Sequence, residues 1–168
     1  MVDLETIFAR RSIRKFTSDS VSEEDITKLL RAAMAAPSGG NRKPWHFIVI
    51  KNRKTLDKLA EHPYGKMLYE APLCIAVCGD PSLTPLPRDF IREDCSAATM
   101  NILHAAVELG LGAVWIGLAL EEHYDIIRSI LGIPNEIHPA NLIAIGYPAE
   151  EKEPRTQYDE SRIHKEKW

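Results

Sequence analysis

Long apolar runs are absent from this chain of 168 residues, and that absence excludes the first class of proteins to consider. A transmembrane helix needs about 20 consecutive apolar residues, and no stretch approaches that length. The N-terminus carries acidic residues early and has no apolar signal region, so nothing indicates secretion. We therefore expect a cytoplasmic protein without a membrane partner.

Cysteine is scarce, with three residues and hence an odd number. Cys74 and Cys78 fall in one apparent strand, where their separation is too great for a disulfide. Cys95 falls in a helical pattern. We expect all three thiols to be reduced and buried, as is usual in a cytoplasmic protein.

Familiar catalytic motifs are missing as well. The chain has no HExxH and no paired CxxC, which argues against a built zinc site. Residues 110–112 (GLG) follow a helical pattern and precede a strand, the reverse of the order in a Rossmann glycine turn. Neither a phosphate-binding GxxxxGK(S/T) nor a GxSxG elbow occurs. His46 and His104 are isolated and are interpreted as packing or surface residues. Such a chain would depend on a cofactor for any chemistry.

Charge is nearly balanced overall but not locally. Lys and Arg number 21 against 24 Asp and Glu, a net charge of -3, which gives no reason to expect nucleic acid as a partner. Cations nevertheless gather in residues 10–15 (RRSIRK), directly after a short amphipathic stretch. Guanidinium groups at such a point suit phosphate or carboxylate oxygens. The alternative is a solvated, charged helix end, the commoner fate of such a run.

Helical and extended patterns alternate without a linker, so residues 1–168 are predicted to form one domain. Ser22 has the character of an N-cap, with Asp25 as a weak capping-box partner. The strands are apolar runs, which predicts a sheet covered by helices on both faces. The predicted helices are residues 3–9, 23–36, 53–61, 89–109 and 121–131; the predicted strands are 45–51, 72–78, 113–117 and 141–147; residues 37–41 and 80–87 are predicted loops.

The tail, residues 149–168, is polar and charged but is not composed like a disordered end. It contains Tyr158, Ile163 and Trp168, three large apolar or aromatic side chains. We therefore expect the tail to pack on something, and a second copy of the chain is one candidate.

Several segments, in one order and spacing, carry a resemblance to a known family. They are residues 10–16 (RRSIRKF), 37–45 (PSGGNRKPW), 110–117 (GLGAVWIG), 146–148 (GYP) and 161–162 (SR). Each is unspecific alone, but the series from about Leu4 to Arg162 resembles the FMN-dependent nitroreductase family over nearly the whole chain.

The resemblance implies an α+β fold, an α-β-α sandwich whose central sheet is mostly antiparallel or mixed and is flanked by helices. It also implies an intertwined homodimer with two FMN sites at the interface and the tail packed across it. The residues it implies in FMN binding are Arg10, Arg11, Ser12, Arg14, Pro37, Ser38, Gly39, Asn41, Lys66, Ile116, Gly117 and Arg162. It implies no catalytic side chain and no metal, because the flavin carries the chemistry.

Within that set, the resemblance assigns residues 10–12 and Arg162 to the FMN phosphate, and Arg14 and Lys66 to the flavin pyrimidine. Residues 37–41 would come from the other subunit, and the backbone around residues 116–117 would face flavin N5. Convergent guanidinium groups suit a phosphate, and a fixed cation near N1 favours the reduced flavin. Judged from the residues alone, the second motif, residues 37–45, could equally be a helix stop, and Arg162 could equally be a solvated surface residue. Trp115 fits the core better than a flavin stack.

The chain departs from the family pattern at Lys43, Pro63 and Glu160, where glutamine, asparagine and lysine are common. The implied activity is reduction of FMN by NADH or NADPH, followed by electron transfer to a small-molecule acceptor such as a nitroaromatic or quinone, with ping-pong kinetics. Two alternatives remain open: a flavin-binding or carrier protein without turnover, and a flavin-destroying or dehalogenating member of the same family.

Overall fold

One antiparallel sheet forms the centre of the molecule. The computed structural model describes residues 4–118, 120–154 and 156–168, and in them four strands pair in the order β1-β2-β4-β3. The strands are β1 (Trp45–Ile50), β2 (Leu73–Gly79), β3 (Gly112–Gly117) and β4 (His138–Gly146). The two central strands are buried along nearly their whole length, whereas β1 exposes part of its edge. The continuous apolar runs of β2 and β4 therefore reflect cover on both faces, as predicted.

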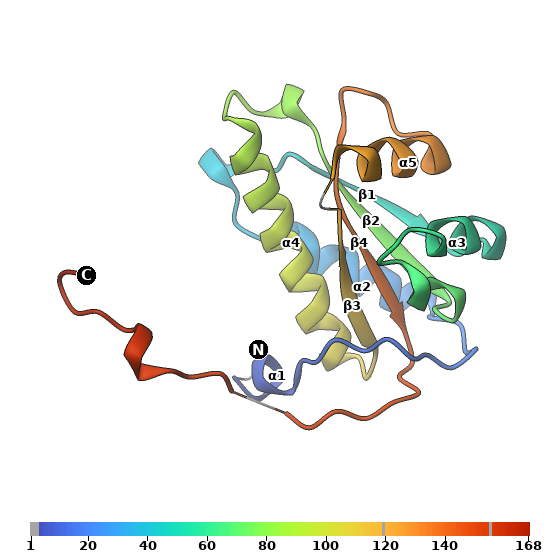
Figure 1. The fold of residues 1–168 in the computed structure, drawn as a ribbon, viewed down its shortest axis with the longest axis horizontal. Coiled ribbons are helices and arrows are strands. Elements are labelled where there is room, and N and C mark those ends of the chain that lie inside the picture. The colour runs from blue at the N-terminus through green and yellow to red at the C-terminus, as the bar shows by residue number, and fades with distance from the viewer. Residues whose placement is uncertain (1–3, 119, 155) are drawn as a thin grey trace.

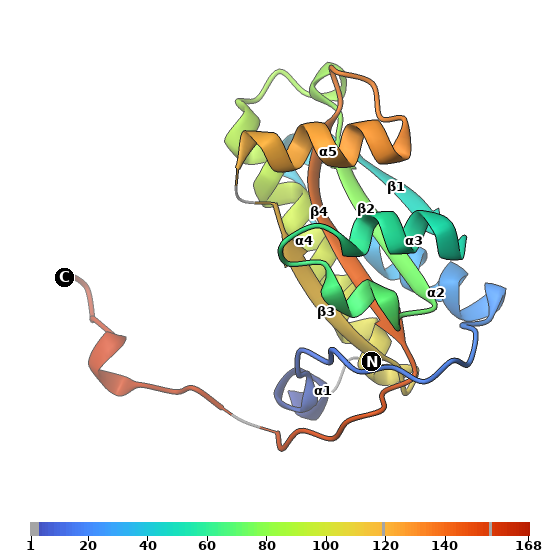
Figure 2. The same ribbon diagram turned by 45° about the vertical axis from the view of Figure 1, so that its right-hand side comes forward.

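Helices cover the two faces of the sheet in separate pairs (Figures 1 and 2). The helices α2 (Glu23–Met34) and α4 (Arg88–Glu108) pack on one face, and α3 (Arg53–Ala60) and α5 (Glu121–Leu131) on the other. The short α1 (Leu4–Ala9) lies against the C-terminal end of α4, where the Thr6 hydroxyl donates to the Glu108 carboxylate. The α+β sandwich with an antiparallel sheet is confirmed.

The largest difference from the predicted elements is at β4. The predicted strand begins at Asn141, whereas the observed strand begins at His138 and includes Pro139. Proline has no N–H for the ladder and is unfavourable in a central strand. The sheet accommodates it by a register shift in β4: Val77 of β2 pairs with Asn141 and the next residue, Cys78, pairs with Pro139, so Ala140 is the extra residue. This irregularity is a β-bulge, which the sequence pattern does not reveal.

The predicted helix starts are more accurate than the ends. Ser22 caps α2 by accepting the Asp25 amide at 3.0 Å, as predicted. The helix ends at Met34 rather than Ala36, because the residue before a proline avoids the helical conformation and Pro37 follows. Short 3-10 turns, η1 (Gly39–Asn41), η2 (Lys66–Tyr69), η3 (Pro81–Leu83) and η4 (Glu160–Arg162), are too brief to give a periodic pattern.

The three cysteines are free thiols in the core, which confirms their predicted state. Burial raises the pKa of Cys74 and of Cys95 to about 12, and that of Cys78 to about 11. Because the thiolate is the reactive form, these residues are not nucleophiles near neutral pH. Among the helices that the structure describes, none is long and apolar enough to cross a membrane.

Candidate functional site

The cationic segment, residues 10–14, lies beside the first residues of β3. Ser12 forms a parallel bridge with Ala113, and the Ile13 amide donates to the Ala113 carbonyl at 3.1 Å. The buried Ile13 side chain fits only because Gly112 has no side chain: a Cβ there would lie 2.7 Å from Ile13 Cγ2. The GLG motif thus holds the cationic segment against the sheet.

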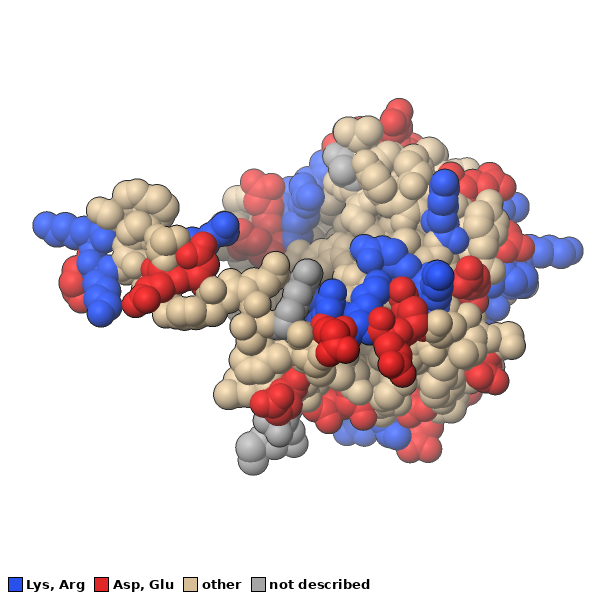
Figure 3. Space-filling model, turned by 60° about the horizontal axis from the view of Figure 1, so that its bottom comes forward, with Lys and Arg blue, Asp and Glu red and all other residues tan. Residues whose placement is uncertain are grey.

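Residues 147–153, here called the C-terminal strap, fix this segment from the other side. The Lys152 ammonium donates to the Ser12 carbonyl at 2.6 Å, and Glu150 Oε1 accepts the Arg14 amide at 2.6 Å. Figure 3 looks onto this end of the molecule and shows basic side chains intermixed with acidic ones. Glu150 and Lys152 could not be singled out from the sequence, because contacts between residues so far apart in the chain leave no local signal.

The arginines of the cationic segment differ in their engagement. The Arg11 guanidinium donates to the Glu153 carbonyl, and Arg14 Nη1 makes a long bond of 3.4 Å to the Ser12 carbonyl. In the described part of the chain, the half-buried Arg10 guanidinium makes no hydrogen bond or ion pair, and its side chain lines a pocket with His104, whose pKa is lowered by burial and then by the charge of Arg10. Arg10 is therefore the arginine most available to an anionic ligand.

Replacing Glu150 by alanine is expected to loosen the cationic segment. Its carboxylate accepts the amides of Arg14 and Lys15, and the first of these bonds is the main cause of its lowered pKa. With a discount for solvent, we expect a loss of about 1 kcal/mol, or a fall in Tm of roughly 2–4 °C. Thermal denaturation at pH 7 would measure it.

The matched control is Glu151→Ala, which changes an exposed neighbour whose side chain makes no hydrogen bond or ion pair to another described residue. Because the folded-state pKa of Glu150 is lowered, its contribution to the stability of the folded protein is present above the ordinary carboxyl pKa and is lost as the pH falls through the lowered value. The stabilities of the two variants should therefore become equal in acid. Equal stability of Glu150→Ala and Glu151→Ala at pH 7 would contradict this role of the strap.

The other end of β3 presents an open backbone edge. β3 is an edge strand, and its Ala113 carbonyl points outward to the cationic segment. Backbone groups alternate in direction along an antiparallel ladder, so the amide of Gly117 points outward as well. Gly117 is exposed, and a Cβ there would meet nothing within 4 Å. Ile116 is buried, and its backbone groups point toward β4. Of Ile116 and Gly117, the two residues predicted to face the flavin, Gly117 is therefore the one open to a ligand.

A shallow pocket of about 360 Å³ adjoins this edge. Trp115 is half-buried and packs against the α2–α4 side of the core, which agrees with its interpretation as a core residue, and its surface reaches the pocket. The residues that line the pocket are Tyr64, Arg92, Ser96, Trp115, Gly117, Leu118 and Ala140.

Lys66 begins η2, on the α3–α5 side of the sheet. Its neighbours Met67 and Leu68 pack in the same core cluster as Ile13 and Ile116. Tyr64, two residues before Lys66, lines the same pocket as Gly117, so this segment lies near the end of β3. Lys66 itself is exposed.

The loop of residues 37–41 lies far from the cationic segment. It packs on the N-terminal half of α4, where the Gly39 amide donates to Asp94 Oδ1 at 2.9 Å. The α1 end of the cationic segment contacts α4 near Glu108 instead. Those two points on α4 are about 21 Å apart at the rise of an α-helix. Figure 1 shows η1 and α1 at opposite ends of α4.

Arg162 is also remote from the cationic segment. It lies in η4 with an 84% exposed side chain and forms an ion pair with Asp159 at 2.9 Å. Residues 156–158 still line a pocket with Arg10 and His104, whereas the tail after them extends away from the body of the molecule in both views (Figures 1 and 2). The residues predicted to bind FMN therefore do not all lie together within a single chain.

Histidine 138 is a buried titratable group that the sequence analysis did not single out. Arg88 Nη2 donates to its Nδ1 at 2.7 Å, so the neutral ring carries its proton on Nε2, which is buried without a partner among the described residues. Burial, followed by Arg88, Arg92 and Arg128, lowers the pKa of His138 to about 4. The ring is a neutral structural element at pH 7.

This arrangement predicts a loss of stability in mild acid. As the pH falls below about 6.5, His138 is protonated in the unfolded chain but stays neutral in the folded protein until about pH 4. The free energy of unfolding therefore decreases between these two pH values. At about 1.4 kcal/mol per pKa unit, the upper limit is about 3 kcal/mol. Urea unfolding of wild type and His138→Gln between pH 7.5 and 4 should show a smaller acid loss in the variant. Parallel curves would contradict the prediction.

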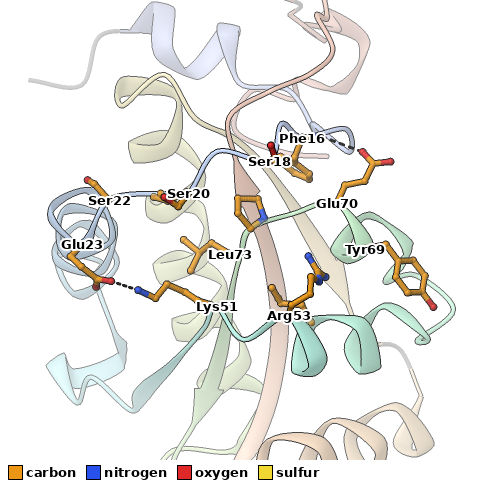
Figure 4. A pocket seen from close by; sticks show the side chains of 13 residues that line it. Phe16, Ser18, Ser20, Ser22, Glu23, Lys51, Arg53, Tyr69, Glu70 and Leu73 are labelled. Atoms are coloured by element: carbon orange, nitrogen blue, oxygen red, sulfur yellow. Dashed lines mark hydrogen bonds and ion pairs between the residues drawn. The ribbon is translucent and has the colours of Figure 1, made fainter.

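A larger groove, of about 850 Å³, lies elsewhere and is lined by different residues (Figure 4). It lies between the start of α2 and the start of α3. Its cations are engaged within the protein: Lys51 pairs with Glu23, and Arg53 with Asp57 and the carbonyls of Leu68 and Ala71. None of the predicted site residues lines it. We therefore place the candidate site at β3 rather than in this groove.

Comparisons with known proteins bear on the family to which the chain belongs. The model of the family described as Nitroreductase family matches residues 7–71 and 62–147. A relative from Archaeoglobus fulgidus, provisionally named NADH dehydrogenase/NAD(P)H nitroreductase, is 47% identical over 98% of each chain. A crystal structure from Parabacteroides distasonis with the same provisional name is 42% identical, with a TM-score of 0.93 over 98% of each chain. A nitroreductase structure from Desulfovibrio desulfuricans, in complex with FMN, is 32% identical, with a TM-score of 0.85 over 98% of this chain and 96% of that one. The family match, the identities and the shared fold together show that the chain belongs to the nitroreductase family.

Proposed function

We propose that this protein is an FMN-dependent oxidoreductase that takes electrons from NADH or NADPH and passes them to nitroaromatics, quinones or related small acceptors. The observation that carries the proposal is the two-ended site on β3. A cationic segment lies at the start of the strand, with the Arg10 guanidinium making no hydrogen bond or ion pair to any described residue, and an open glycine edge lies at the strand's end.

The described residues fit FMN in charge and shape. Arg10, with Ser12 beside it, would hold the phosphate, since a doubly charged anion suits a guanidinium and a hydroxyl. Gly117 would let the flavin ring approach the strand edge, where its outward amide would donate to N5. Arg14 and Lys66 would supply positive charge at the pyrimidine. Residues 113–117 span roughly 13 Å, a length suited to an extended cofactor.

Bound FMN would supply the chemistry, accepting a hydride from the nicotinamide and then delivering electrons to the acceptor. The protein's residues bind and orient the cofactor, and no side chain is assigned as general acid or base. The D. desulfuricans relative contains FMN, and the A. fulgidus relative carries an NAD(P)H nitroreductase name, which supports this cofactor and donor. Ping-pong kinetics would follow if donor and acceptor use the same face in turn.

The site would be completed by a second copy of the chain, in a cytoplasmic homodimer. Residues 37–41 and Arg162 lie apart from the cationic segment within one chain, so they would reach a flavin held mainly by the other chain. Tyr158, Ile163 and Trp168 project from the extended tail with exposed side chains, which supports packing across the dimer.

The proposal is tested by cofactor identity and turnover. The purified protein, as isolated or after addition of FMN, is heated and the released ligand is analysed by chromatography. We expect FMN, a yellow colour bleached anaerobically by NADH or NADPH, and recolouring by a nitroarene or quinone. Failure to bind flavin after reconstitution, or binding of FAD alone, would contradict the proposal. A bound flavin that is never reduced would favour a carrier.

A further inference from the structure

Asp94 is a buried carboxylate whose placement the family site does not explain by itself. It lies in the N-terminal part of α4 with 7% of its surface exposed. Its Oδ1 accepts the Gly39 amide at 2.9 Å, and its Oδ2 is buried without a hydrogen-bond partner in the part of the chain that the structure describes. A buried carboxylate oxygen left without a partner destabilises the fold, so Asp94 is better explained by its single bond to the loop than by a contribution to general stability.

The loop that Asp94 holds has an unusual backbone. Gly40, Asn41 and Lys43 all have positive φ, at 57°, 56° and 53°. Non-glycine residues rarely adopt this left-handed conformation, and they keep it only where surrounding contacts fix it. Within the loop, Ser38 supplies two such contacts, since its hydroxyl accepts the Lys43 amide and its carbonyl the Asn41 amide, each at 2.9 Å. Those contacts shape the loop internally but do not attach it to the body.

Attachment comes from α4 and the loop before it. Gly39 packs so closely that a Cβ would lie 2.5 Å from Leu86 Cδ1 and 3.9 Å from Asp94 Oδ2. A residue with a side chain could not take this place without displacing Leu86. In the described residues, the Asp94 bond is the one recorded hydrogen bond from a side chain outside the loop to its backbone between residues 37 and 41.

We propose that Asp94 is a positioning residue of the flavin site: it anchors Gly39 and so presents Ser38 and Asn41 to a flavin held mainly by the other chain. This inference rests on the proposed function, since it assigns the loop to FMN. Asp94 acts through the loop backbone and does not itself touch the cofactor.

The test compares Asp94→Ala with Asn101→Ala. Asn101 is a matched control because it lies on the same helix and also links it to another backbone, donating to the Ala32 carbonyl at 2.9 Å. Two quantities are measured: hydrogen–deuterium exchange of residues 38–43 in the flavin-free protein, and the FMN dissociation constant from flavin fluorescence. Asp94→Asn is the conservative variant, since its amide oxygen still accepts the Gly39 N–H.

We expect Asp94→Ala to speed exchange in the loop at least tenfold and to weaken FMN about tenfold. Asn101→Ala should change neither more than about twofold, and Asp94→Asn should restore most of both. Unchanged loop exchange in Asp94→Ala, unchanged FMN affinity despite faster exchange, or an equal effect of Asn101→Ala would each overturn the proposal. Those outcomes leave tight FMN binding by the wild type intact. Absence of FMN binding by the wild type would overturn the proposed function as well.

Discussion

Arg10→Ala is expected to weaken FMN binding about ten- to a hundredfold without unfolding the protein. Arg10 is half-buried, lines a pocket with His104, and makes no hydrogen bond or ion pair through its guanidinium among the described residues. A charge-assisted hydrogen bond to phosphate contributes roughly 1.5–3 kcal/mol, which sets the expected range. Arg11→Ala should have a smaller effect, because Arg11 already donates to the strap at Glu153. Fluorescence titration of flavin-free protein measures both.

Arg14→Ala should act chiefly on the midpoint potential of the bound flavin. The phosphate is charged in both oxidation states, so its partners stabilise both nearly equally. Charge near N1 appears only on reduction, so a cation there acts on the difference between the two states, by about 1–2 kcal/mol. Arg31→Ala, which removes an exposed side chain on α2, is the control for loss of a positive charge. An unchanged potential with weaker FMN binding would place Arg14 with the phosphate group instead.

Arg162→Ala is expected to weaken FMN in the same range as Arg10→Ala. This expectation depends on the second copy, because Arg162 lies on the extended tail and pairs with Asp159. Normal FMN affinity in this variant would mean that the ion pair with Asp159 is its whole role.

Gly117→Val is expected to leave stability nearly unchanged and to abolish flavin reduction. A Cβ at Gly117 meets nothing within 4 Å, and β3 is an edge strand, so the single chain accommodates a side chain there. The same side chain would occupy the space in which the flavin ring approaches the backbone. A displacement of about 1 Å at a reacting centre can cost a hundredfold in rate, so we expect at least that loss.

The measurement pairs the Tm with the anaerobic rate of flavin bleaching by NADH. Gly117→Ala should be intermediate, since it adds a single methyl group. A Gly117→Val protein that is reduced at the wild-type rate would contradict the assignment of this edge to the flavin. A large fall in Tm would instead indicate that the strand end packs more tightly than the structure has it.

Sequence periodicity predicted the helices and strands because their apolar faces are long and regular. It failed at the start of β4, which was predicted at Asn141, because a bulge in β4 allows the strand to include Pro139. It also missed η2, which is too short for a period to appear. The bulge depends on pairing between distant segments, and such pairing leaves no local signal.

The candidate site was predictable in part from the same sequence. The sequence singled out the cationic segment and Gly117, and the fold places that segment beside the start of β3 and Gly117 at the end of the strand. The strap contacts of Glu150 and Lys152, and the anchor at Asp94, could not be predicted. Each is one charged residue in an ordinary polar context, and its partner is a backbone group far away in the chain.

The most direct test of the account is subunit complementation. One variant carries Arg10→Ala with Ser12→Ala, and the other carries Ser38→Ala with Asn41→Ala; different affinity tags allow the mixed dimer to be isolated. If each site is built from two chains, a mixed dimer contains one doubly altered site and one intact site. We therefore predict one FMN per mixed dimer bound with wild-type affinity, while both parent dimers bind weakly. A mixed dimer without a tight site, or a fully active monomer, would contradict the shared flavin site.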